Sequence, residues 1–144
     1  MLYRLRQRLS NEGGFTLIEL LVVILIIGIL AAIAIPAFLS QTSKANDSAA
    51  KTQVGTLQTT IEAYASENNG SFAGATLAKL EAIEPTLKDT STATAVVGPV
   101  AAEEFTVSST AKGTNDVYTL KNKEGAVTRT CTASKGGCSA AGTW

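Results

Sequence analysis

The 144-residue chain contains no histidine and only two cysteines. Without histidine it lacks the commonest general base and metal ligand of proteins, and two thiols alone make a poor zinc site. The sequence also has no glycine-rich phosphate-binding loop. We therefore predict that the chain is not an enzyme and that it holds neither a metal nor another cofactor.

An excess of one charge is also absent, because 12 Lys and Arg residues balance 12 Asp and Glu residues. The first 14 residues are basic, with Arg4, Arg6 and Arg8 against Glu12, so the remainder is mildly acidic. No basic face is left to neutralise phosphates, which excludes nucleic-acid binding as the main task.

Charge is missing altogether from Leu20–Leu39, a run of twenty residues. As a helix, this run spans about 30 Å and matches the hydrocarbon core of a bilayer. The basic residues before it predict a cytoplasmic N-terminus, with the residues from Gln41 onward outside. Two plainer interpretations stay open. The run is a simple membrane anchor, or it is a secretory signal peptide cut after Ala32-Ile33-Ala34, which releases a soluble product starting near Ile35.

An acid, Glu19, stands at the head of this run, within Gly13-Gly14-Phe15-Thr16-Leu17-Ile18-Glu19. A carboxylate in the middle of a bilayer costs about 2.5–3.5 kcal/mol, so an intramembrane acid indicates function and needs a partner. The nearest candidate is a new α-amino group, produced by cutting the chain between Gly14 and Phe15.

These residues resemble the prepilin processing site of the type IV pilins, and the resemblance covers roughly residues 4–70. It implies that a membrane-bound prepilin peptidase removes the leader after Gly14 and methylates the new N-terminus at Phe15. It further implies that Glu19 pairs with the Phe15 amine of a neighbouring subunit during assembly. Pairing with the amine of its own subunit stays open.

The resemblance also implies partners and a location. The chain would lie first in the cytoplasmic membrane and then in an extracellular pilus, or fimbrium, on a bacterial cell surface. Its partners would be further copies of itself, minor pilins, and the pilus assembly platform with its ATPase. Such filaments serve adhesion, twitching motility or DNA uptake.

The same N-terminal module occurs in the major pseudopilins of type II secretion systems, which are the alternative. Major pseudopilins usually carry a calcium-binding C-terminal loop and lack a disulfide. This chain has two cysteines near its C-terminus and few clustered acids near Asp116, which favours the pilin.

One long helix is predicted from Phe15 to about Asn68, with Asn68-Asn69-Gly70 as its end. Its first half, 15–40, is the transmembrane and assembly half, and 41–70 is amphipathic. A globular domain is expected to cover the apolar stripe of the second half, which consists of Val54, Leu57, Ile61, Tyr64 and Ala65.

Gly28 and Pro36 interrupt the apolar half. Proline cannot donate a hydrogen bond to the preceding turn, so a tolerated kink is one interpretation. The resemblance implies another, in which the helix between these two residues becomes extended in the filament.

An α+β fold is predicted, with the long helix packed against a small three- to four-stranded antiparallel sheet. The leader is 1–14, and 71–100 forms a connecting segment with a short helix that ends near Glu84 before Pro85. Residues 101–144 form the sheet and a C-terminal loop. Strand-like runs start at Phe105, Val117 and Ala126, and Gly125 suits a hairpin turn.

Cys131 and Cys138 both fall on the external side, where disulfides persist, and Gly136-Gly137 allows a tight loop between them. A disulfide is therefore expected, with free thiols or a metal site as the alternatives. Many pilins have such a C-terminal disulfide loop. Asn69 and Asn46 lie in N-x-S sequons and are interpreted mainly as a helix cap and a helix-surface residue.

Overall fold

The computed structural model describes residues 14–132, 137–139 and 141–144. Most of the predicted leader, 1–14, including its three arginines, lies outside the described residues. The elements follow one another as α2 (Leu17–Glu67), α3 (Leu77–Ile83), the 3₁₀ helix η1 (Pro85–Lys88), β1 (Ala93–Val100), β2 (Glu104–Ala111), β3 (Val117–Lys123) and β4 (Ala126–Thr132). The chain divides into two compact units, Met1–Leu39 and Ser40–Trp144, which are described separately.

The first unit contains the N-terminal part of α2. Its apolar composition makes it the one helix, among the described residues, that is long and apolar enough to cross a membrane. None of the residues 14–39 is buried. Gly28 and Pro36 both lie within the helix, so the segment between them is helical in the single chain. The extended form implied for the filament stays a prediction.

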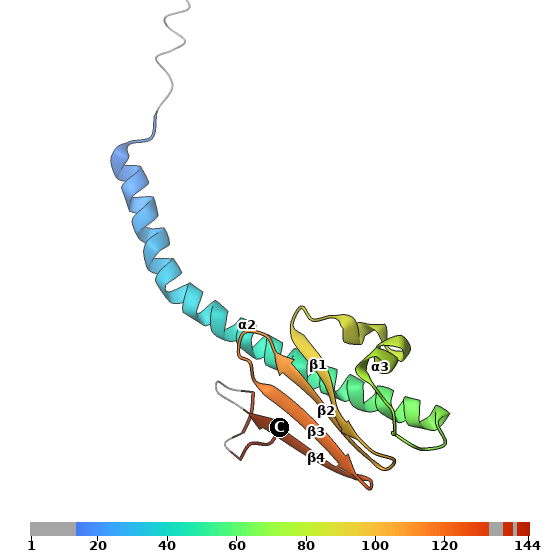
Figure 1. Cartoon of the computed structure of the whole chain (residues 1–144). Coiled ribbons are helices and arrows are strands. Elements are labelled where there is room, and N and C mark those ends of the chain that lie inside the picture. The colour runs from blue at the N-terminus through green and yellow to red at the C-terminus, as the bar shows by residue number, and fades with distance from the viewer. Residues whose placement is uncertain (1–13, 133–136, 140) are drawn as a thin grey trace, which may run out of the picture. The chain divides into compact units, whose positions relative to one another are not determined.

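In the second unit, α2 continues as an amphipathic helix alongside the sheet (Figure 1). Its apolar stripe is buried, as predicted. The helix ends at Glu67. There Asn69 and Gly70 both adopt positive φ angles, and the Gly70 N–H donates to the carbonyl of Ala65 at 2.8 Å. Such a left-handed turn satisfies carbonyls that the helix leaves without partners, and glycine adopts it without steric cost.

The four strands form one antiparallel sheet in the order β1-β2-β3-β4. Buried and less buried residues alternate along β2 because successive side chains of a strand point to opposite faces. Glu124 and Gly125, both with positive φ, form the two-residue turn between β3 and β4. Two positive φ angles are the mark of a type I′ hairpin turn. The predicted α+β fold, with a four-stranded sheet, is therefore confirmed.

The core lies between the stripe of α2 and the inner face of the sheet. Phe105, Val107, Tyr118 and Leu120 of the sheet are at most 1% exposed, and so are Val54, Leu57 and Ile61 of the helix. The connecting segment completes this core with Leu80 of α3 and Leu87 of η1. α3 ends at Ile83, as expected from Pro85, whereas Leu87 lies in the separate turn η1.

Strand β1 was not predicted, and it lies inside the segment expected to be only a connection. Its sequence contains Gly98 and Pro99, which usually interrupt strands. The register with β2 shifts between Val97 and Val100, so these two residues sit at an irregularity of an edge strand. A Cβ on Gly98 would approach the side chain and carbonyl of Thr106 at 3.3 Å, which explains a glycine at this point.

Candidate assembly site

The predicted cleavage site lies immediately before α2. Gly14 and Phe15 are exposed, and the Phe15 side chain is 92% accessible. A Cβ added to Gly14 would have no neighbouring atom within 4 Å. The fold itself therefore places no demand on Gly14, and any requirement for a small residue must come from a partner that acts on this site.

Thr16 and Glu19 form a reciprocal cap at the start of α2. The N–H and hydroxyl of Thr16 both donate to Oε2 of Glu19 at 2.8 Å, and the Glu19 N–H donates back to the Thr16 hydroxyl at 3.2 Å. This is a capping box, in which an acid three residues after a threonine satisfies donors that the first turn leaves unpaired. The sequence interpretation missed this role, although the spacing Thr16-x-x-Glu19 was its signal.

The cap determines what Glu19 can do next. Within the described part of the chain, Oε2 of Glu19 accepts both hydrogen bonds from Thr16. A carboxylate has about four acceptor positions, so Glu19 has capacity for a further donor. The positive end of the helix dipole also favours an anion at this position.

Within the described residues, the large apolar side chains that follow Glu19 are exposed. From Leu20 to Leu39, the large ones are between 48% and 72% exposed. Side chains this apolar are stable only in lipid or against other apolar side chains.

In the second unit, a disulfide joins Cys131 and Cys138, with a Cα–Cα distance of 5.8 Å. The predicted disulfide is therefore confirmed. After the disulfide, the chain returns to the sheet, where the N–H of Cys131 donates to the Gly142 carbonyl at 2.8 Å. The Trp144 indole then donates to the carbonyl of Thr130 at 3.0 Å and meets the Tyr118 ring edge to face. The bridge and Trp144 thus fix the C-terminal segment to β3 and β4.

A buried polar cluster, consisting of Asp47, Asp116 and Tyr118, lies beside this segment. Each residue is at most 2% exposed, and the Thr114 hydroxyl donates to Asp47 at 2.7 Å. Burial, and after it the negative charges of Asp47 and Asp116, raise the pKa of the Tyr118 phenol to about 12. The sequence interpretation missed this cluster. A signal existed for Asp47, which stands seven residues before Val54 on the same helical stripe.

The two sequon asparagines differ in their surroundings. The amide of Asn46 donates to the Lys112 carbonyl at 2.8 Å and so ties α2 to the turn between β2 and β3. Asn69 is exposed at the left-handed turn after α2. Their interpretation as structural residues stays a prediction.

The comparisons concern the N-terminal part of the chain. A family model described as the prokaryotic N-terminal methylation motif matches residues 9–35. The type IV major pilin protein PilA of Myxococcus xanthus is 50% identical over 59 residues, which is 41% of this chain and 27% of that protein. A fimbrial protein of Pseudomonas aeruginosa is 41% identical over 68 residues, or 47% of this chain and 44% of that protein.

A protein of another system is also similar to part of this chain. The type II secretion system core protein G of Aeromonas hydrophila is 36% identical over 59 residues, which is 41% of each chain. The matched regions therefore span 27–44% of the length of these relatives. These findings confirm the resemblance to type IV pilins. They also show that a type II secretion protein is similar to part of this chain.

Proposed function

We propose that the chain is a structural subunit of a type IV pilus, processed between Gly14 and Phe15 by a prepilin peptidase. One observation carries this proposal. An acid caps the start of an exposed apolar helix and follows a Gly-Phe junction by only a few residues. A plain anchor or an ordinary signal peptide has no use for this combination.

Packing of the apolar helices supplies the free energy of assembly in this proposal. A subunit leaves the membrane only if other subunits cover the side chains of Leu20–Leu39, which are exposed in the single chain. Burying one large apolar side chain contributes about 1.5–3 kcal/mol, so the fourteen large apolar side chains of this run together outweigh other terms. Apolar packing alone does not specify how far one helix slides along the next.

Glu19 supplies that register. After cleavage, the amine of Phe15 is a cation, and the methylation motif over residues 9–35 supports its modification to a methylated amine. A buried acid beside a neighbouring subunit's amine is compensated, whereas a misplaced subunit leaves a buried unpaired charge, at a cost of about 3–5 kcal/mol. The segment between Gly28 and Pro36 becomes extended as the helices pack.

In this proposal the subunit moves through three surroundings. Residues 15–40 hold it in the cytoplasmic membrane, while the second unit folds outside. The assembly platform with its ATPase then moves it into an extracellular filament of identical copies, with minor pilins as further partners. Glu19 and the Phe15 amine first meet at this docking step.

The deciding experiment is N-terminal sequencing and intact-mass measurement of filaments sheared from the cell surface. We expect a chain that starts at Phe15, heavier by one methyl group and lighter by two hydrogens for the disulfide. A chain that starts near Ile35, or the absence of this protein from the sheared material, would contradict the proposal. The first result would instead support an ordinary signal peptidase product.

A major pseudopilin of a type II secretion system is the second candidate, because the core protein G of Aeromonas hydrophila is also similar to this chain, over 59 residues. The Cys131–Cys138 disulfide favours the pilin. Deletion of the gene separates the two. Loss of surface filaments with normal export of extracellular enzymes supports the pilin, and the reverse result supports the pseudopilin.

A further inference from the structure

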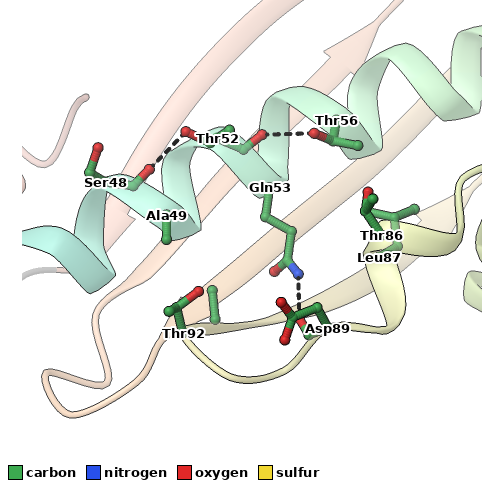
Figure 2. A pocket seen from close by; sticks show the side chains of 10 residues that line it. Ser48, Ala49, Thr52, Gln53, Thr56, Thr86, Leu87, Asp89 and Thr92 are labelled. Atoms are coloured by element: carbon green, nitrogen blue, oxygen red, sulfur yellow. Dashed lines mark hydrogen bonds between the residues drawn. The ribbon is translucent and has the colours of Figure 1, made fainter.

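A polar groove of about 320 Å³ lies in the second unit, between α2 and the connection from η1 to β1 (Figure 2). α2 contributes Thr52, Gln53 and Thr56 to its wall, η1 contributes Thr86, and the connection after η1 contributes Asp89. None of these residues belongs to the assembly site at the start of α2. The hydrogen bonds around the groove determine which chemical group it accepts.

Three of the four threonine hydroxyls that line the groove, those of Thr52, Thr56 and Thr86, have already used their hydrogens inside the protein. Thr52 donates to the Ser48 carbonyl at 3.0 Å, and Thr56 donates to the Thr52 carbonyl at 3.2 Å. On the opposite wall, the Thr86 hydroxyl donates to Glu84 at 2.8 Å. A hydroxyl has one hydrogen and two lone pairs, so these three side chains have only acceptor capacity left.

Gln53 is fixed in the same way. Figure 2 shows its side chain pointing from α2 toward Asp89, where its amide N–H donates to the Asp89 carbonyl at 3.3 Å. Its carbonyl oxygen accepts from the Ser109 hydroxyl at 2.6 Å. The position of the Gln53 side chain is therefore set by both walls and by the sheet.

Asp89 gives the groove its charge. Its Oδ1 accepts from the Ser91 N–H at 2.8 Å, and a carboxylate has about four acceptor positions, so Asp89 has capacity for a further donor. Hydrogen bonds from Ser91, and more weakly the charge of Lys112, hold the pKa of the Asp89 carboxyl below its ordinary value. The side chain is exposed, so it offers an ionised oxygen to solvent or to a partner.

We propose that this groove binds a lysine ammonium from a second copy of the chain within the filament. An ammonium is a cation with three donors and no acceptor, which complements a carboxylate surrounded by acceptor oxygens. The inference rests on the proposed pilus function. It adds a contact between the parts of two subunits that lie outside the membrane.

The chain itself supplies suitable cations. Lys44, Lys88 and Lys121 are exposed basic side chains of the second unit. The guanidinium of Arg129 instead lies over the Trp144 ring, at 5.4 Å from its centre. Lys88 directly precedes Asp89 in the sequence, and the charge of Lys112 acts on the Asp89 carboxyl. Contacts within one chain must therefore be separated from contacts between copies.

A water-soluble carbodiimide tests the proposal on sheared filaments, because it joins a carboxylate to an amine only where the two are in contact. Crosslinked dimers are separated from monomers on a gel and digested, and the joined peptides are identified by mass spectrometry. We expect Asp89 joined to a lysine in the dimer band. Asp89→Glu should keep this crosslink, Asp89→Asn should lose it, and Glu67→Gln, a change at another exposed acid, should leave it unchanged.

Salt tolerance gives a second readout, since a pair of exposed charges is weakened by salt. Asp89→Asn filaments should dissociate at lower salt than wild-type and Glu67→Gln filaments. Two results would overturn the inference while leaving the pilus proposal intact. In one, the crosslinks in the dimer band do not involve Asp89; in the other, Asp89 is joined only to Lys88 or Lys112 in the monomer band. If wild-type cells make no filament of this protein, the proposed function fails and the inference with it.

Discussion

Glu19 has one role that the structure shows and a second role that we propose. In the single chain its carboxylate caps α2 through Thr16. In the proposed filament its charge attracts an amine from another subunit. Glutamine at this position separates the two roles, because a capping box accepts Glu or Gln but only Glu carries a charge.

We predict that Glu19→Gln leaves the protein inserted in the membrane and processed but strongly reduces the yield of sheared filaments. Thr16→Ala is the matched control, since it removes the cap at a cost of about 1 kcal/mol and keeps the acid. It should assemble better than Glu19→Gln. Normal filament yield from Glu19→Gln would show that the cap, rather than the charge, is what assembly requires. Glu19→Ala removes both roles and should assemble no better than Glu19→Gln.

Tyr118 predicts how the second unit responds to alkali. Its pKa is raised from 10.0 to about 12 in the folded chain. Between these two pH values the unfolded chain has lost the phenol proton while the folded chain still holds it. Stability therefore falls as the pH rises through this window, by about 2–3 kcal/mol in total.

Tyr118→Phe should remove this part of the loss, whereas Tyr64→Phe should retain it. The measurement is urea unfolding of the full chain in detergent micelles, followed by circular dichroism from neutral pH to pH about 12. An equal alkaline loss in wild type and Tyr118→Phe would mean that the phenol titrates in the folded chain as it does in the unfolded one.

At the scale of elements, the second half of α2 depends on the stripe that faces the sheet. Ile61 is fully buried, whereas Gln58 on the same helix is only half-buried and hydrogen-bonds to Glu62. We predict that Ile61→Ala lowers the free energy of unfolding by about 2–5 kcal/mol. Gln58→Ala should change it by less than about 1 kcal/mol. Urea unfolding of both variants checks this, and equal losses would contradict the assigned face.

The elements also show what the sequence predicts well. The stripe Val54, Leu57 and Ile61 repeats with the period of a helix, so its burial follows from local pattern. The turn at Gly125 was predicted because few residues adopt positive φ. Such features depend on residues close together in sequence, and the sequence displays them directly.

Strand β1 and the polar cluster could not be predicted in this way. Gly98 and Pro99 signal a break, and only pairing with β2 makes a strand of this segment. Asp116 is buried, although an acid in a loop ordinarily indicates solvent. For the assembly site, the sequence indicated Glu19 by its cost in lipid. It did not indicate the hydrogen bonds that hold it.

At the scale of the whole molecule, the two units differ in whether their apolar side chains are buried within the chain. The second unit has its own core and disulfide, so its fold is complete within one chain. The first unit buries none of its apolar window, and its stability is set by lipid or by other subunits. The proposed cleavage after Gly14 would create the amine that is proposed to pair with Glu19.

Gly14→Leu tests that step, because a Cβ added at Gly14 has no neighbour within 4 Å among the described residues. We predict that the variant keeps its leader, migrates more slowly on a gel than the processed chain, and stays in the membrane without forming filaments. The second unit should unfold at the same urea concentration as in wild type. Gly55→Ala, at another glycine with open space around it, is the control and should be processed normally. If Gly14→Leu yields a chain that begins at Phe15, the peptidase does not require a small residue before the cut. If that variant assembles with its leader still attached, a free Phe15 amine is not required for docking, and the register assigned to Glu19 must come from another contact.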